Sequence, residues 1–139
     1  MSIAKIMSTR VVSVHMDDSL QSLRELFAAA EFHHLVVVHE NKLQGIISDR
    51  DLMKSISPFV DTLSERKLDR ATLDKKAHQI MTREVITLNP SDSVYSAIEL
   101  FNTHKISCIP IIDTKRHPVG MVSWRDVMKF MQSRVEAKR

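Results

Sequence analysis

The residues best suited to chemistry are a serine and an aspartate three positions apart, and this pair occurs twice. Ser48 and Asp51 lie where an apolar run gives way to a helical pattern, and Ser123 and Asp126 take the same place later in the chain. A serine hydroxyl can donate to a phosphate, and a carboxylate can accept from both hydroxyls of a ribose. The free N–H groups that begin a helix also favour an anion. This combination indicates a ribonucleotide site.

The same pair also has a purely structural interpretation. In a capping box, a serine caps the helix and an acid three residues later accepts from the serine's backbone N–H. Glutamate is the usual acid in that motif, whereas both copies in this chain carry aspartate. The residues alone therefore leave both interpretations open.

The elements that must position these residues are duplicated as well. Residues 6–54 align with residues 80–129, with one extra residue in the second copy, and the only two glycines, Gly45 and Gly120, fall at the same point of the repeat. An internal duplication of this kind predicts two equivalent half-domains. We expect them to pack about a pseudo-two-fold axis, with paired clefts where they meet.

Each copy predicts the element order β-α-β-β-α, so the expected fold class is α/β (α+β). Short β-branched runs predict first strands, polar pairs predict helix starts, and apolar runs on either side of a polar turn predict two further strands. The first copy has these features at 11–14, Asp18-Ser19, 35–38 and 43–47, and the second at 85–88, Asp92-Ser93, 109–112 and 119–122. A final helix is expected to begin at Ser48 and at Ser123.

The repeats divide the chain into a first repeat at 1–57, a charged and partly helical linker at 58–78, and a second repeat at 79–139. Residues 61–78 are highly charged and contain no glycine, which predicts an exposed loop with a helix late in it. A mobile linker whose structure depends on a partner is the alternative.

Composition narrows the classes of protein to consider. The 139 residues are 43% hydrophobic and 27% charged, which suits one compact domain. A net charge of +3 suits an anionic small ligand, whereas scattered cations and 5% aromatic content argue against a nucleic-acid partner. No stretch is apolar enough for a membrane span or a signal peptide, so we expect a cytoplasmic protein. Cys108, the only cysteine, is expected to be buried rather than reactive.

Several motifs, taken in order, resemble a known family. Ile80-Met81-Thr82 precedes a short strand, an apolar run spans 107–112, and Gly-x-x-Ser-x-Arg-Asp occurs in both copies. The repeat is similar to a CBS motif, and the pair resembles a stand-alone tandem CBS-domain protein, or Bateman module, over nearly the whole chain except the linker. The His33-His34 strand also resembles nucleotide-binding repeats in the regulatory gamma subunit of AMP-activated kinase. The first repeat departs from the family pattern at Val36, where the second has Pro110.

The resemblance implies two ligand-binding clefts. One cleft would use Ser48 and Asp51 for phosphate and ribose, His33 and His34 on its phosphate side, and an adenine wall from Thr82, Ile86, Ser107 and Cys108. The other cleft would use Ser123 and Asp126, with Ser8, Val12 and His33 or His34 opposite. His33 stands where the family has a small residue, and it could fill one cleft instead of lining it.

The function these features favour is binding without catalysis. The sequence has no nucleophile paired with a base and acid, and two glycines cannot build a glycine-rich phosphate loop. We therefore predict a regulatory module that needs no cofactor, binds AMP, ADP or ATP rather than S-adenosylmethionine or NAD, and signals through an effector protein. The resemblance further implies a homodimer.

Two other functions remain open. The first is a dimerisation or protein-interaction module with vestigial clefts. The second is a metal or redox sensor built on the histidines and Cys108, although the histidine spacing matches no known set of metal ligands.

Overall fold

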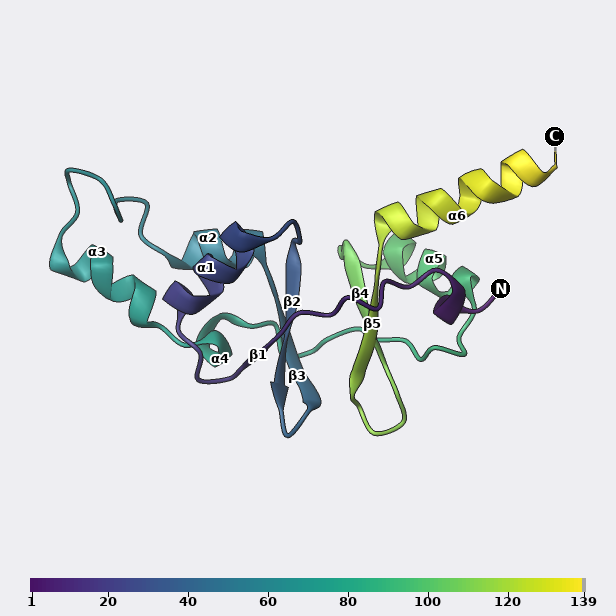
Figure 1. The fold of residues 1–139 in the computed structure, drawn as a ribbon, viewed down its shortest axis with the longest axis horizontal. Coiled ribbons are helices and arrows are strands. Elements are labelled where there is room, and N and C mark those ends of the chain that lie inside the picture. Colours follow the sequence, from purple (N-terminus) through teal and green to yellow (C-terminus); the bar gives the residue numbers. More distant parts are fainter. Residues whose placement is uncertain (139) are drawn as a thin grey trace. The chain divides into compact units, whose positions relative to one another are not determined.

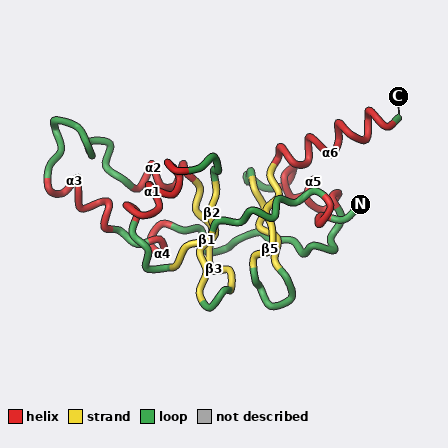
Figure 2. The backbone as a smooth tube through the Cα atoms, viewed as in Figure 1, coloured by secondary structure: helices red, strands yellow, loops and turns green. Residues whose placement is uncertain are grey.

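A computed structural model describes residues 1–138, and these residues form two compact units. The first-repeat unit is Val12–Val85, and the second-repeat unit combines Met1–Val11 with the chain from Ile86 onward. The units thus exchange segments relative to the repeats, since the start of the chain packs with the second repeat. The chain as a whole mixes helices and strands, as the duplicated pattern predicts (Figures 1 and 2).

The first-repeat unit is built on a three-stranded sheet. Strand β1 (Ser13–His15) pairs in parallel with β2 (His34–His39), which pairs antiparallel with β3 (Lys42–Ser48). The predicted first strand is therefore present, two residues later than expected at its start. Helix α1 (Leu20–Ala29) begins after Ser19, whose side chain accepts from the Ser22 N–H as an N-cap, and α2 (Asp49–Ser55) follows β3 directly.

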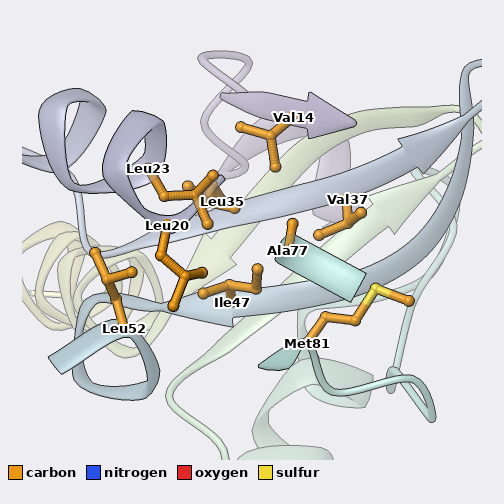
Figure 3. Packing of buried hydrophobic residues seen from close by; sticks show 9 residues of the cluster. All are labelled: Val14, Leu20, Leu23, Leu35, Val37, Ile47, Leu52, Ala77 and Met81. Atoms are coloured by element: carbon orange, nitrogen blue, oxygen red, sulfur yellow. The ribbon is translucent and has the colours of Figure 1, made fainter. Parts of the chain in front are cut away.

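The core of this unit lies between the sheet and its helices (Figure 3). Leu20 and Leu23 of α1 are fully buried against Leu35 and Ile47 of the sheet. The four-residue helix α4 (Ala77–Ile80), from the end of the linker, adds buried Ala77 to the same cluster. Its presence explains why residues 76–85 belong to this unit, because they complete an apolar core that the first repeat alone leaves open.

The second-repeat unit has a two-stranded sheet. Strand β4 (Cys108–Ile112) pairs antiparallel with β5 (Pro118–Ser123), and helices α5 (Val94–Thr103) and α6 (Trp124–Ala137) accompany them. A short 3-10 helix, η1 (Ile3–Lys5), inserts fully buried Ile3 into the core of this unit. The N-terminal segment is therefore a structural part of the second-repeat unit.

The prediction of a strand at 85–88 is wrong. Of these four residues, only Leu88 forms a β-bridge, and it pairs in parallel with Ile111. In the first repeat the equivalent ladder includes a bond from the Val36 N–H to the Val12 carbonyl, 3.0 Å long. The residue aligned with Val36 is Pro110, which has no N–H to donate. The second repeat therefore loses one rung of the ladder and with it the regular strand.

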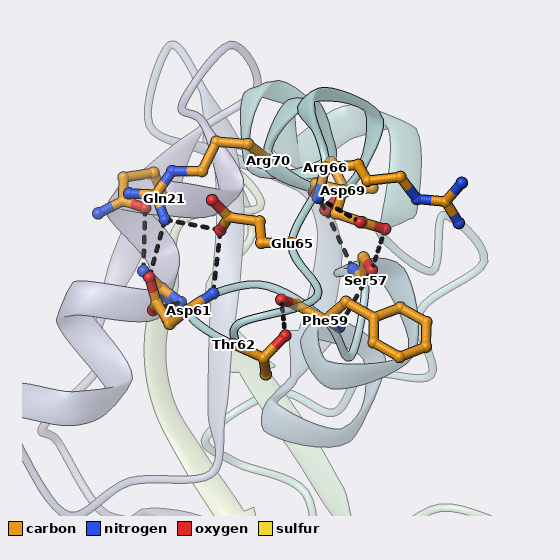
Figure 4. Close-up of polar contacts among 11 residues, drawn as sticks. Gln21, Ser57, Phe59, Asp61, Thr62, Glu65, Arg66, Asp69 and Arg70 are labelled. Atoms are coloured by element: carbon orange, nitrogen blue, oxygen red, sulfur yellow. Dashed lines mark hydrogen bonds and ion pairs between the residues drawn. The ribbon is translucent and has the colours of Figure 1, made fainter.

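The linker is folded for much of its length. It contains α3 (Lys67–Ala71) and the 3-10 helix η2 (Thr72–Asp74), whose Leu73 is buried. Asp61, at a positive φ of 65°, accepts from Arg24 of α1 at 3.0 Å and from Arg70 of α3 at 2.8 Å (Figure 4). Hydrogen bonds from Arg70 and Arg24 hold the pKa of Asp61 below its ordinary value. The predicted helix late in this segment is present, and polar contacts attach it to α1.

Candidate functional site

Both serine–aspartate pairs lie at the junction of a strand and a helix. Ser48 ends β3 and caps α2, and its backbone N–H donates to Asp51 Oδ2 at 2.9 Å while its hydroxyl accepts from the Asp51 N–H at 3.0 Å. In the second repeat, the Ser123 N–H donates to Asp126 Oδ2 at 2.8 Å, and the Ser123 hydroxyl oxygen lies 3.4 Å from the Asp126 nitrogen. Both pairs are therefore capping boxes.

The capping bonds fix the position of each carboxylate through one of its two oxygens. The bonds from the serines to Asp51 and Asp126 all fall on Oδ2. Both aspartates are half-buried, so they remain within reach of solvent. The structural and functional interpretations are thus compatible, because the cap orients a carboxylate whose second oxygen can accept from a ligand.

The two repeats differ in the hydroxyl of the serine. In the second repeat, Ser123 Oγ also donates to Asp126 Oδ2 over 3.1 Å, so its one proton is directed to its own aspartate. In the first repeat, Ser48 Oγ accepts from the Asp51 N–H, and within residues 1–138 it shows no matching bond to its own aspartate. The proton of the capping serine is therefore directed to the aspartate in the second repeat and not in the first.

Two neighbouring histidines lie where β2 begins, and the first of them, His33, contacts the start of α2. The backbone carbonyl of His33 accepts from the Asp49 N–H at 2.9 Å, and His33 Nδ1 lies 2.9 Å from Asp49 Oδ2. His33 is 79% exposed on its side chain, so it points to the surface of its unit. Sequence reasoning missed Asp49 as its partner, because the contact joins residues that are 16 positions apart.

His34 is directly opposite Ser48 in the β2–β3 register. Burial lowers the pKa of His34 below its ordinary value; the nearby Asp49 and Asp51 carboxylates oppose this effect, and His33 adds to it. The imidazole of the unliganded chain is therefore largely uncharged at neutral pH.

The second repeat places Ser107 and Cys108 where the first has the histidines. Cys108 is opposite Ser123 in the β4–β5 register, and the Ser107 carbonyl accepts from the Trp124 N–H at 3.3 Å. Burial, and next the charge of Asp126, raise the pKa of Cys108 to about 12. The thiol is thus protonated and poorly nucleophilic, which argues against a redox sensor at this cysteine.

A segment from elsewhere in the chain runs beside each of the strands that carry the serines. Thr82 exchanges backbone hydrogen bonds with Ile46 of β3 at 3.0 and 3.1 Å, and Ser8 does the same with Met121 of β5 at 2.8 and 2.9 Å. These contacts place Thr82 in the unit of Ser48, and Ser8 in the unit of Ser123.

The repeated glycines explain how these segments come so close. A Cβ built on Gly45 would lie 2.5 Å from Met81 Sδ, and one on Gly120 would lie 2.5 Å from Met7 Sδ. Neither glycine has a positive φ, so close approach, and not backbone conformation, accounts for them. Comparison of the repeats aligns the two glycines and also the two methionines, but it does not show that each glycine contacts a methionine.

The predicted ligand residues divide evenly between the units. The first-repeat unit holds Val12, His33, His34, Ser48, Asp51 and Thr82, and the second-repeat unit holds Ser8, Ile86, Ser107, Cys108, Ser123 and Asp126. Within the first-repeat unit, a hollow of about 420 Å³ adjoins the His33–Asp49 pair, and of the predicted residues His33 alone lines it. Among residues 1–138, no three His, Cys, Asp or Glu side chains gather closely enough to hold a metal ion.

Comparison with known proteins identifies the family. The CBS domain profile matches residues 3–58 and 77–133, so the chain belongs to the CBS domain family and carries two repeats of it. A CBS domain-containing protein of Dictyostelium discoideum is 28% identical over 131 residues, which is 93% of this chain and 90% of that protein. The homoserine O-acetyltransferase of Methanocorpusculum labreanum is 32% identical over 124 residues, which is 88% of this chain but only 23% of that enzyme.

Solved structures agree with this assignment. The CBS domain pair of the protein MJ0100, in complex with 5′-methylthioadenosine and S-adenosyl-L-methionine, is 26% identical, with a TM-score of 0.76 over 96% of this chain and 98% of that one. A CBS domain-containing protein of Bacillus anthracis has a TM-score of 0.80 at 19% identity, covering 96% of this chain and 94% of that one, and so shows the fold alone. No helix within residues 1–138 is long and apolar enough to cross a membrane.

Proposed function

We propose that this chain is a regulatory module that binds an adenosine-containing ligand through its serine–aspartate pairs. The observation that carries the proposal is the duplicated geometry, in which capping bonds on Oδ2 hold Asp51 and Asp126 at the start of a helix. A carboxylate held in this way is suited to accept from the hydroxyls of a ribose. The CBS domain pair of MJ0100, which was crystallised with two adenosine-containing ligands, supports the same class of ligand.

Within that class we propose AMP, ADP or ATP as the ligand. The first-repeat unit is the better candidate for a phosphate, since Ser123 Oγ donates to its own aspartate whereas Ser48 Oγ shows no such bond within the described residues. Thr82, which runs beside the strand that ends in Ser48, would add a second hydroxyl. S-adenosylmethionine and 5′-methylthioadenosine are the competing ligands, because they carry the ribose without the phosphate.

We further propose that the module acts in the cytoplasm as a homodimer and reports the bound ligand to an effector protein. The homodimer and the effector protein rest on the family resemblance, and the cytoplasmic location rests on the apolar pattern of the sequence. Equilibrium sedimentation of the purified chain, with and without AMP, tests the dimer directly. A mass equal to that of one chain at every concentration would refute it.

Isothermal titration with AMP, ADP, ATP, NAD, S-adenosylmethionine and 5′-methylthioadenosine tests the binding. A specific ligand at a hundredfold excess over its Kd also stabilises the fold by about 2.7 kcal/mol, which a thermal shift detects. Asp51→Asn and Asp126→Asn are the informative variants, because an amide oxygen can still accept the capping bond whereas the amide nitrogen cannot accept a ribose hydroxyl. Exposed Asp74 supplies the matched control, Asp74→Asn.

We expect the two capping-box variants to lose affinity while they keep the stability of the unliganded chain. The control should keep both its affinity and its stability. Binding that survives both variants unchanged would refute the assignment of the aspartates. An absence of binding with every compound would favour the alternative of an interaction module with vestigial clefts.

A further inference from the structure

His34 and Ser48 lie on the same face of the sheet in the first-repeat unit. They are directly opposite each other in the antiparallel β2–β3 register, and side chains in such a pair stand on one face with their Cβ atoms about 5 Å apart. The next pair, Leu35 and Ile47, is fully buried in the core that includes the residues of α1 (Figure 3). Because successive side chains alternate along a strand, His34 and Ser48 lie on the other face of the sheet.

The charge on His34 depends on burial and on three ionisable neighbours within this unit. Burial is the largest influence and lowers the pKa of His34 below its ordinary value. Asp49 and Asp51, in the first turn of α2, oppose that effect, and His33, the preceding residue, adds to it. The unliganded imidazole is neutral mainly because it is half-buried, so a further negative charge beside it would favour the return of the proton.

A phosphate at the Ser48 hydroxyl would supply that negative charge. A phosphate monoester carries nearly two negative charges above pH 7, since its second pKa is about 6. Asp49 and Asp51 already make the surroundings of Ser48 negative, so the site binds a phosphate more tightly if a cation forms beside it. A protonated imidazole can provide this cation, and its hydrogen bond to a phosphate oxygen is about twice as strong as one between neutral groups.

We propose that the first-repeat unit takes up a proton on His34 when it binds a phosphate at Ser48, so that its affinity for a nucleotide depends on pH. This inference rests on the proposed function and adds the regulation of the same site. An arginine in this position would be charged at every physiological pH, whereas a histidine makes the charge conditional on both pH and ligand. The module would therefore bind its nucleotide more tightly as its surroundings become more acidic.

The second-repeat unit places a different group in the equivalent position. Cys108 is opposite Ser123 in the β4–β5 register, as His34 is opposite Ser48. Burial, and next the charge of Asp126, raise the pKa of Cys108 to about 12, so the thiol stays uncharged at physiological pH. Binding through Ser123 and Asp126 should therefore vary little between pH 7 and pH 8. The two repeats thus provide a comparison within one chain.

Isothermal titration of the Asp126→Asn chain with AMP tests the proposal, because this variant weakens the other site. Repeating the titration in buffers of different ionisation enthalpy gives the number of protons that bind with each ligand. We expect an uptake of at least about half a proton, and an affinity that falls about three- to tenfold from pH 7 to pH 8. A site that simply prefers the dianion of AMP would bind more tightly at pH 8. Adenosine, which lacks the phosphate, should bind without proton uptake.

Two further substitutions in the same background assign the proton to one residue. His34→Gln should abolish both the proton uptake and the pH dependence, since glutamine can still donate a hydrogen bond but does not titrate. His39→Gln, at the exposed far end of β2, is the matched control and should keep both. Proton NMR of the imidazole provides a second readout. The titration midpoint of His34 should move to higher pH when AMP is saturating, and adenosine should not move it.

Failure of the proton coupling is distinguishable from failure of the proposed function. Binding of AMP without proton uptake, or with an uptake that persists in His34→Gln, would overturn the coupling and leave the binding site in place. Equal uptake with AMP and adenosine would also overturn it, because the phosphate would then not be the cause. Absence of binding with both compounds at either pH would refute the proposed function itself, and the coupling with it.

Discussion

Replacing Gly45 with alanine tests the close packing of the segment that carries Thr82. The new Cβ would lie 2.5 Å from Met81 Sδ, 2.8 Å from Met81 Cγ and 2.9 Å from the Thr82 carbonyl oxygen. The methionine side chain can rotate away, but the carbonyl belongs to the backbone that pairs with Ile46. The segment must therefore move away from β3, or the strand must bend.

The expected cost follows from that geometry. Overpacking by one carbon in a closely packed site destabilises by about 1–3 kcal/mol. Gly120→Ala is the matched comparison, because its nearest backbone atom, the Ser8 carbonyl oxygen, would be 3.1 Å away, which a small shift relieves. Replacement of a strand glycine by alanine also recovers roughly 0.5–1 kcal/mol of backbone entropy in each variant. We therefore expect Gly45→Ala to be the more destabilising of the two.

Urea denaturation of both variants measures the global cost, and amide hydrogen exchange locates it. In Gly45→Ala, the amides of Ile46 and Thr82, which bond to each other's carbonyls, should exchange faster than in the parent chain. The Met121 amide, which donates to the Ser8 carbonyl at 2.9 Å in the other unit, should be unchanged. The pattern should reverse in Gly120→Ala.

A double variant separates the two contacts of Gly45. Met81→Ala alone should cost about 2–5 kcal/mol, because Met81 is buried in the core of its unit. In the double variant with Gly45→Ala, the loss of unfolding free energy should be smaller than the sum of the losses in the two single variants. The truncated side chain at position 81 leaves room for the new methyl group. Strict additivity, or a Gly45→Ala chain as stable as the parent with unchanged exchange at Ile46 and Thr82, would refute the packing argument.

Three further outcomes follow from the polar groups. Asp61→Asn removes the charge that Arg24 and Arg70 share, so it should speed tryptic cleavage in the linker while the urea midpoint changes little. High salt should likewise speed tryptic cleavage in the linker of the parent chain. Cys108 should react slowly with a disulfide reagent at pH 8 in the folded chain and rapidly in urea, because the rise in its pKa from 9.0 to about 12 reduces the thiolate fraction about 1,000-fold. Folding lowers the pKa of His34, so the unfolded chain binds the proton more readily, and the free energy of unfolding should fall as the pH is lowered through 6.5. The variant His34→Gln should show a smaller fall. A pH profile of the melting temperature that is the same in the variant and the parent chain would contradict this expectation.

Local patterns in the sequence specified the elements of each repeat. Ser19 and Ser93 cap α1 and α5 where the polar pairs predicted helix starts. The strands predicted at 35–38 and 43–47 are present as β2 and β3, each with one extra residue at both ends. The capping-box interpretation of Ser48 and Asp51 was also available from their spacing, and it is confirmed. These features depend on residues only a few positions apart, so the sequence carries them directly.

Contacts between distant residues decided the rest. Pro110 cannot donate the bond that would hold the first strand of its repeat, and local sequence does not reveal this loss. The carbonyl that would have accepted the bond lies more than 20 residues earlier in the chain, because adjacent parallel strands are joined by a long connection. The His33–Asp49 contact, the attachment of Asp61 to Arg24 and the exchange of residues 1–11 and 79–85 between the repeats likewise join distant parts of the chain. The sequence by itself determined the duplicated order of helices and strands, apart from the first strand of the second copy, and the serine–aspartate pair in each copy. Only the tertiary structure decided which segments complete each core, because apolar burial is not directional and depends on which surfaces meet in space.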